Sequence, residues 1–334
     1  SLTWLTSSLG ADTLRVYQLE EIVVEATRIR VPYKHLPLSI DIVTHDEIDH
    51  SIANSATDAV SFLPGVFVQR TGDFGRADVA IRGLGNMGRR LSVLIDGHPV
   101  KMGLFGCTIT HALPLNNVER IEVIRAPTSV LYGSDALGGV INIVTSEPSE
   151  NPTATGEISY GSYSTLKYRL SHGTTIGDLG YLISFDRRTS DGHLPNSAYE
   201  GTDISTKLTF DRSPTKISVL FKYFDGHKEE PALSTDPPGT QSDIWNDYKR
   251  GTIDAVFTHQ IGNGKLTFKA YDEFGEHEFS DGWHSKDHSR GAMLHYSGSL
   301  DHSIDFNLGI DFREQSGERL SQPKGDWSKN EVGV

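Results

Sequence analysis

The stretch ERIEVIRAPTSVLYGSDALGGVINIVTS, residues Glu119–Ser146, is the most informative part of this chain. Its β-branched residues predict two short strands, Arg120–Arg125 and Val140–Thr145. Between them, Pro127 can open a helical turn over Thr128–Leu131, and the small, glycine-rich residues that follow allow sharp turns and close backbone approach. The pattern therefore indicates a strand–turn–strand unit of an α+β domain.

This stretch resembles the end of the plug domain of TonB-dependent outer-membrane receptors, where the usual pattern is VERIEV-RGP-S-LYG-A-GGVINI-T. The chain follows that pattern almost residue for residue, although Ala126 stands where the family usually has glycine. Earlier segments resemble the plug in the same order: DAVSFLPGVFVQR at Asp58–Arg70, DVAIRGLG at Asp78–Gly85 and LSVLIDG at Leu91–Gly97. Together with a segment that begins at Glu21, they make five matches in family order, so the resemblance implies a complete plug domain.

The segment EIVVEA lies ahead of these matches and contains a short β-prone run. The resemblance implies that it is the TonB box, which adds a strand to TonB, the energy-transducing partner at the inner membrane. Glu25 stands where threonine is common in the family. The predicted partner-binding residues are Glu21, Ile22, Val23, Val24, Glu25 and Ala26.

Composition argues against several other classes of protein. The net charge of −13 and the pI of about 5.5 make nucleic acid an unsuitable partner. The single cysteine, Cys107, excludes an internal disulfide and a CxxC metal site. The sequence contains no HExxH, GxSxG or phosphate-binding glycine-rich motif, so we expect neither an enzyme nor a resident cofactor. No apolar run reaches about 18 residues, which argues against a transmembrane helix but not against a transmembrane barrel.

From Ala154 onward, apolar and polar residues alternate with a period of two, as in the apolar row Ile217, Val219, Phe221 and Tyr223. The alternation predicts nine strands and the start of a tenth. A soluble β-sandwich would show the same alternation. The regular exchange of short turns and long polar loops is typical of outer-membrane barrels, whose apolar rows face lipid and whose polar rows face the lumen.

We therefore expect an α+β plug domain followed by an antiparallel transmembrane β-barrel, located in the bacterial outer membrane. Plugged outer-membrane transporters have about 22 strands, so the predicted strands correspond to the N-terminal portion of a barrel, truncated in this chain. The expected division is 1–19 as a leader or signal-peptide remnant, 20–30 as the TonB-box region, 31–150 as the plug and 151–334 as barrel.

One candidate substrate site lies between two histidines that the resemblance places near the plug apex. His98, Met102, Cys107 and His111 fall within one probable loop, and the resemblance implies that apex loops contact substrate. Imidazole, thioether and thiolate are ligands that copper prefers, so His98, Met102 and Cys107 form a candidate metal site. The alternative is that Met102 and Cys107 pack inside the plug while the histidines face water.

Exposed aromatic residues and histidines on the predicted outer loops supply a second set of candidate substrate residues, Trp245, Tyr248, Trp283 and His284. Ordinary hydrated loop residues are the alternative. Three arginines lie in the plug segments, Arg82, Arg120 and Arg125. The resemblance implies that they latch the plug by pairing with carboxylates on the inner barrel wall, whereas pairing within the plug would give them a purely local role.

The resemblance implies TonB-dependent active import of a scarce ligand, a ferric siderophore or another metal chelate. Copper, haem and cobalamin are alternatives within the same family. A passive or adhesive outer-membrane barrel is an alternative of a different class, and it would not need a partner-binding strand. The expected partners are TonB, outer-membrane lipid and a small-molecule ligand.

Overall fold

The computed structural model describes residues 23–24, 31–32, 39–70, 76–85, 90–113, 115–128, 132, 134–232, 235–237, 239–240, 242–300, 304–321 and 327–333. The predicted leader lies outside these residues, as do Glu21, Ile22, Glu25 and Ala26 of the predicted TonB box. In the part of the chain that the structure describes, no helix has the length and apolar character needed to cross a membrane.

The N-terminal domain is built on a five-stranded sheet with the order β3-β8-β9-β6-β7. Its central strands, β8 (Val118–Ile124) and β9 (Gly139–Thr145), are the two strands predicted from the stretch 119–146, and they pair antiparallel. The other strands are β3 (Ile40–Thr44), β6 (Leu91–Ile95) and β7 (His98–Pro99). Most of the predicted helical turn 128–131 lies outside the described residues, and a 3-10 helix, η3 (Ser134–Ala136), was not predicted.

Short helices and hairpins complete this domain. The α1 helix (His45–Asp49) starts with a capping box, because the Thr44 hydroxyl accepts from the Glu47 amide at 3.3 Å and the Glu47 carboxylate accepts from the Thr44 amide at 2.8 Å. The remaining elements are α2 (Ala56–Val60), the hairpin β4 (Val66–Arg70) with β5 (Ala77–Ile81), η2 (Thr110–Ala112), and the pair β1 (Val23–Val24) with β2 (Val31–Pro32).

The core of the N-terminal domain covers both faces of its sheet. The larger apolar cluster joins α1 and α2 to the sheet and includes Val60, Ile81 and Ile121, each completely buried. A smaller cluster on Leu94 and Ile124 contains residues of the turn region 126–140. Because both faces are covered, β9 is a nearly continuous apolar run, whereas β8 keeps charged residues at Glu119, Arg120 and Glu122.

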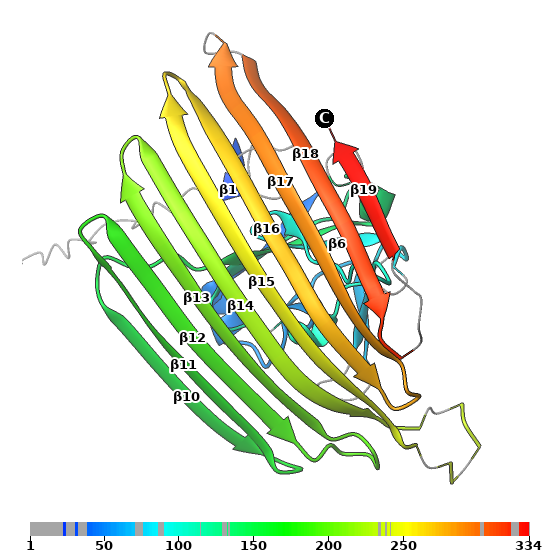
Figure 1. Cartoon of the computed structure of the whole chain (residues 1–334). Helices are drawn as coiled ribbons and strands as arrows, with labels where there is room; N and C mark the ends of the chain where they lie inside the picture. The colour runs from blue at the N-terminus through cyan, green and yellow to red at the C-terminus, as the bar shows by residue number, and fades with distance from the viewer. Residues whose placement is uncertain are drawn as a thin grey trace, which may run out of the picture.

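The second part is a ten-stranded antiparallel sheet in strict chain order from β10 to β19. This confirms the prediction of nine strands and the start of a tenth. Figure 1 shows the sheet crossing in front of the N-terminal domain, so one sheet face is turned toward that domain. The strands are β10 (Thr153–Gly161), β11 (Thr165–Ile176), β12 (Leu179–Ser190), β13 (Tyr199–Arg212), β14 (Thr215–Glu230), β15 (Ile244–Ile261), β16 (Gly264–Phe279), β17 (His284–Leu300), β18 (Ile304–Arg319) and β19 (Trp327–Gly333).

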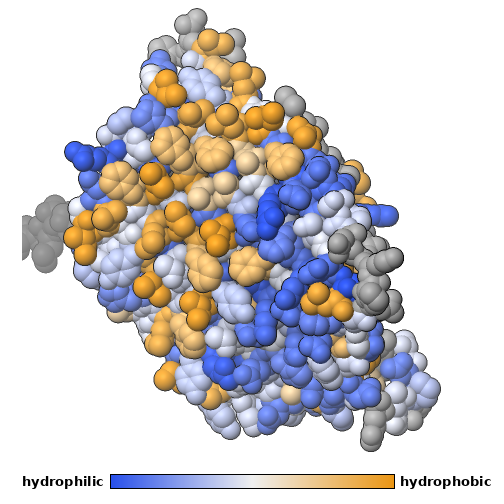
Figure 2. All heavy atoms as spheres, in the orientation of Figure 1, coloured by the Kyte–Doolittle hydropathy of each residue, from blue (hydrophilic) through white to orange (hydrophobic). Residues whose placement is uncertain are grey.

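The face of the sheet that is turned away from the N-terminal domain is divided into two zones. Figure 2 shows an apolar band toward the short turns and a hydrophilic zone toward the long loops. The band contains exposed large side chains from successive strands, among them Leu170, Ile183, Leu208, Phe221, Ile253, Phe268, Leu294 and Ile310. A continuous apolar band of this kind on alternating positions suits contact with lipid.

Candidate functional site

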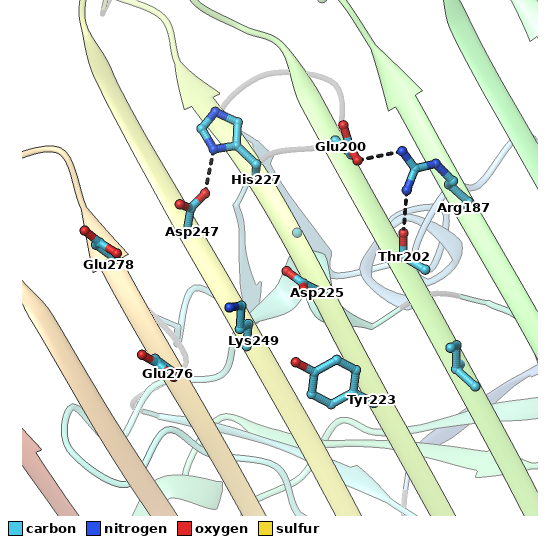
Figure 3. Close-up of a pocket in the computed structure, with 12 residues that line it drawn as sticks. Arg187, Glu200, Thr202, Tyr223, Asp225, His227, Asp247, Lys249, Glu276 and Glu278 are labelled. Carbon is cyan, nitrogen blue, oxygen red and sulfur yellow. Dashed lines mark hydrogen bonds and ion pairs between the residues drawn. The ribbon is translucent and has the colours of Figure 1, made fainter.

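The hydrophilic zone of the outer face contains a hollow of about 560 Å³ between β12 and β16. Figure 3 shows its charged side chains, with Arg187 on Glu200 and His227 on Asp247. Most of its charged residues carry a negative charge, namely Glu200, Asp225, Asp247, Glu276 and Glu278. The positively charged residues are Arg187 and Lys249.

Two of the predicted loop residues lie on this outer face. Trp245 stacks on His227 with ring centroids 5.9 Å apart, and His284 lies 2.7 Å from a Glu276 carboxylate oxygen. Both contacts run between neighbouring strands of the sheet. These two residues are therefore directed away from the N-terminal domain.

The other two predicted loop residues lie near the N-terminal domain. The Trp283 ring is 5.3 Å from the Phe105 ring, and the Arg319 guanidinium lies 4.0 Å from the centre of the same indole. Tyr248 is 8% exposed and packs edge-on against His277 at 5.2 Å. The structure thus divides the predicted loop residues between two faces of the sheet.

The inner face of the sheet is polar and buried where it meets the N-terminal domain. Charged side chains can be buried only if other groups compensate their lost hydration. The buried charged residues on this face include Asp186, Arg188, Asp203, Lys207, Arg250, Asp254, Lys269, Glu273 and Asp287. This interface is the candidate functional site.

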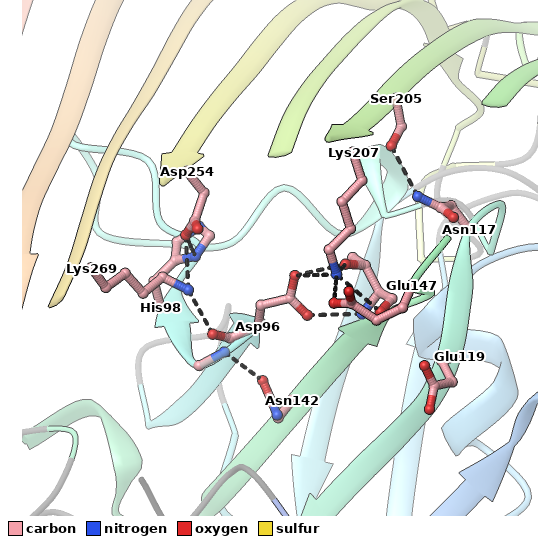
Figure 4. Close-up of polar contacts among 12 residues, drawn as sticks. Asp96, His98, Asn117, Glu119, Asn142, Glu147, Ser205, Lys207, Asp254 and Lys269 are labelled. Atoms are coloured by element: carbon pink, nitrogen blue, oxygen red, sulfur yellow. Dashed lines mark hydrogen bonds and ion pairs between the residues drawn. The ribbon is translucent and has the colours of Figure 1, made fainter. Parts of the chain in front are cut away.

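Two lysines of the sheet hold the ends of β6 and β9 (Figure 4). The Lys207 ammonium donates to the Thr145 hydroxyl at 2.9 Å and pairs with Glu147 at 2.8 Å. The Lys269 ammonium donates to the backbone carbonyl of Asp96 at 2.6 Å. The ends of β6 and β9 are therefore fixed by cations from β13 and β16.

His98 makes a deeply buried contact between the two parts. Its ring is fully buried, and Nδ1 lies 2.9 Å from an Asp254 carboxylate oxygen (Figure 4). Lys269 approaches the same carboxylate at 2.8 Å. The imidazole also stacks on Tyr271, with centroids 4.7 Å apart and an interplanar angle of 24°. The sheet thus encloses His98 with a carboxylate, a cation and an aromatic face.

The segment after His98 is held through its backbone. The amide of Lys101 donates to Glu273 at 2.9 Å, and the amide of Gly103 donates to Asp287 at 2.7 Å. Arg250 pairs with Asp287 at 2.8 Å and donates to the Lys101 carbonyl at 3.5 Å. Buried carboxylates of β16 and β17 therefore accept from main-chain amides, and Arg250 balances their charge.

Asparagine side chains make a further set of contacts. The Asn116 amide donates to Asp203 at 2.8 Å, and the Asn117 amide donates to the Ser205 hydroxyl at 3.3 Å. Both partners lie on β13. Neutral amides thus add directional hydrogen bonds between β13 and the end of the loop that precedes β8.

The arginine latch predicted from the sequence requires a correction. Arg120 pairs with Glu122 at 3.0 Å, and Arg125 pairs with Asp41 at 2.6 Å, so these ion pairs lie within the N-terminal domain. The reason is local, because β8 places both arginines beside carboxylates of their own sheet. Arg82 is exposed at the end of β5. The contacts between the N-terminal domain and the large sheet are made by other residues, chiefly lysines, arginines and carboxylates of that sheet.

The four candidate apex residues are only partly brought together. The sulfur atoms of Met102 and Cys107 lie 3.9 Å apart, and Met102 is buried. His98 instead faces Asp254, and the side chain of His111 is outside the described residues. Across the described ranges, no group of three or more His, Cys, Asp and Glu side chains is arranged to hold a metal ion.

Sequence reasoning missed the inner-wall residues Asp254, Lys269, Glu273 and Asp287. The available signal was their place in the polar rows of the alternating strands, because charges on a lumen-facing row must find partners. That signal identifies the wall residues but not the groups that they contact.

Gly103 is a position where the two parts approach very closely. A Cβ atom at this position would lie against the carbonyl oxygens of His288 and Ser316, nearer than van der Waals contact allows. We expect Gly103→Ala to destabilise docking by about 1–3 kcal/mol, because backbone atoms on both sides must move. Limited proteolysis of the N-terminal domain measures the effect. Gly156→Ala is the matched control, since its Cβ would lie 3.5 Å from Leu170; equal protease resistance of both variants would contradict the prediction.

Glu147 is expected to make docking sensitive to acid. Burial raises the pKa of Glu147, but ion pairs with Lys207 and Lys216 outweigh this effect and lower the pKa below 4.5. The charged form therefore stabilises the docked state above the ordinary carboxyl pKa, and this contribution is lost as the pH falls through the lowered pKa. Melting temperatures between about pH 6 and pH 3 should fall less steeply in Glu147→Gln than in the unmodified protein. Glu150→Gln should leave the slope unchanged, because Glu150 makes no ion pair with the described residues; identical slopes in all three proteins would contradict the prediction.

Comparison with known proteins places both parts of the chain. Residues 32–140 match a family model described as the TonB-dependent Receptor Plug Domain. The chain is 38% identical over 161 residues to the vitamin B12 transporter BtuB of Photobacterium profundum, covering 48% of this chain and 25% of that protein. It is 33% identical over 159 residues to BtuB of Vibrio vulnificus, covering 47% of this chain and 25% of that protein. The matched region thus spans about a quarter of the length of these relatives.

The likeness to solved structures covers more of the chain. The siderophore receptor PiuA from Acinetobacter baumannii superposes with a TM-score of 0.74 at 15% identity, over 86% of this chain and 47% of that chain. The ferric citrate transporter FecA in its unliganded form superposes with a TM-score of 0.72 at 19% identity, over 89% of this chain and 51% of that chain. At these identities the likeness shows the fold, a plug domain seated against barrel strands.

Proposed function

We infer that this chain, which belongs to the TonB-dependent receptors by its plug domain and the barrel strands that follow, takes part in active import of a metal chelate across the bacterial outer membrane. The N-terminal domain is called the plug from here on, and the ten-stranded sheet the barrel wall. The carrying observation is that the plug is held against the wall mainly by hydrogen bonds and ion pairs. Water can replace such contacts, so the plug can be displaced without exposing a large apolar core.

The segment near β1 is proposed to receive the energy for this displacement. Within the described residues, Val23 and Val24 pair antiparallel with Pro32 and Val31 over two residue pairs. A short pairing can be exchanged for a longer one with a partner strand, as in β-strand addition. TonB is the proposed partner, and the segment from Glu21 to Ala26 is its proposed contact.

A metal chelate is proposed as the substrate because the similar proteins are described as handling such compounds. The structural neighbours are a siderophore receptor and a ferric citrate transporter, and the relatives by sequence are vitamin B12 transporters. Ferric siderophores are the first candidate. Cobalamin is the second, favoured by the higher sequence identity to BtuB.

Calorimetric titration of the receptor in detergent tests the substrate. Ferric siderophores, cobalamin, haem and copper are titrated in turn, and one chelate class is expected to bind tightly. The variant Met102→Ala/Cys107→Ala tests the two adjacent sulfur atoms as copper ligands. Copper binding that disappears in this variant would replace the chelate proposal. Uptake that continues after the proton-motive force is dissipated would instead support a passive barrel.

A further inference from the structure

Two cavities lie along one side of the plug, between it and the barrel wall. The small cavity, of about 30 Å³, is lined by Lys101 of the plug and by Thr252 and Glu273 of the wall. The large cavity, of about 780 Å³, is lined by Asp96 of the plug and by Asp254 of the wall. It continues to the short turn at residues 213–215. The two cavities follow each other along the same strands.

The register of β16 locates the boundary between the cavities. Glu273 lines the small cavity and Lys269 lines the large one, and both point inward. Tyr271 is the inward residue between them and is 5% exposed. On the plug, His98 lies between the segments that line the two cavities, and its ring stacks on Tyr271. The stacked rings therefore lie where the cavities are separated.

The stack is fixed from several directions. His98 Nδ1 lies 2.9 Å from Asp254, and Lys269 holds that carboxylate at 2.8 Å. Lys269 also donates to the Asp96 carbonyl, which anchors the plug strand just before His98. A ring held in this way closes the boundary as long as β7 stays against the wall.

We propose that the substrate passage follows this side of the plug and that the stack of His98 on Tyr271 is its gate. The proposal rests on the proposed transport function. When the plug is pulled from its N-terminal segment, β7 moves away from β15 and β16, and His98 leaves Asp254. The two cavities then join into one path toward the short-turn end of the barrel.

Single-channel recording in planar lipid bilayers tests the gate without substrate or TonB. The unmodified receptor is expected to be silent, whereas His98→Ala/Tyr271→Ala should show discrete conductance steps. Tyr271→Ala alone changes only the wall side and should show smaller or rarer steps. Asn54→Ala/Lys167→Ala is the matched control, because it removes a plug–wall contact whose residues line neither cavity, and it should be silent.

The outcomes separate the gate from the transport function. Silence of both gate variants, or equal conductance in the control, would overturn the gate. Chelate uptake by cells with the unmodified receptor is measured in parallel. Failure of the transport proposal appears as absent TonB-dependent uptake, whatever the bilayers show. Failure of the gate proposal appears as silent variants beside normal uptake by the unmodified receptor.

Discussion

Receptors that carry Val24→Pro are expected to bind their ligand with unchanged affinity and to import none of it. Val24 lies in β1, within the segment proposed to add a strand to TonB. Strand addition depends on main-chain hydrogen bonds, and proline removes the amide that one of these bonds needs. The residues predicted to recognise the ligand lie on the outer loops and the plug apex, outside this segment, so binding should be preserved.

The measurement is uptake of labelled chelate by cells, beside calorimetric binding to the purified variant. Val24→Thr is the control, since it keeps the β-branched shape and the backbone amide, and it should retain most of the uptake. Import at the normal rate by Val24→Pro would show that this segment does not transmit energy. A parallel loss of binding would point to a misfolded plug instead.

The fold could be predicted because its signals are local. In the stretch 119–146, β-branched residues and glycines alternate at the spacing of strands and turns, and the structure places both strands at the centre of the plug sheet. The barrel strands could be predicted from the period-two alternation, because one face of each strand lies in apolar surroundings and the other face does not. Both patterns depend on neighbours in the chain, so they can be read from the sequence.

The contacts between plug and wall could not be predicted, because the plug contributes main-chain atoms to many of them. Lys269 donates to the carbonyl of Asp96, and Arg188 donates to the carbonyl of Asn54 at 2.9 Å. Every residue has a carbonyl, so nothing in the sequence marks which one is used. The resemblance led to Arg125 as a latch residue, but its partner Asp41 lies on its own sheet.

The prediction for the plug apex did not give the direction in which the His98 side chain points. The spacing from His98 to Cys107 fits a chelating loop, but β7 turns the imidazole toward Asp254 while the two sulfur atoms approach each other. Residue spacing on a loop sets a maximum reach and does not set orientation. The burial of His98 by the wall depends on residues more than a hundred positions later in the chain, which sequence patterns do not connect.

The same wall contacts make a second large effect expected, at Asp287. Its fully buried carboxylate pairs with Arg250 at 2.8 Å and accepts from the Gly103 amide at 2.7 Å. Asp287→Ala leaves a buried guanidinium without its partner and a main-chain amide without its acceptor. Breaking a buried pair in this way costs about 3–5 kcal/mol. Denaturant titration of the receptor in detergent should show that loss in the free energy of unfolding.

Asp272→Ala is the matched control for this loss. Asp272 lies on the outer face of β16 and pairs with Arg290 at 3.2 Å, where both side chains are partly exposed to solvent. Its removal should cost at most about 1 kcal/mol. Arg250→Leu/Asp287→Leu should recover only part of the stability lost in Asp287→Ala, because it removes the unpaired guanidinium but leaves the buried Glu273 carboxylate without this cation and the Gly103 amide without an acceptor. If Asp287→Ala and Asp272→Ala lose equal stability, the buried pair does not hold the plug. The main-chain contacts at Lys101 and Asp96 must then hold the plug against the wall instead.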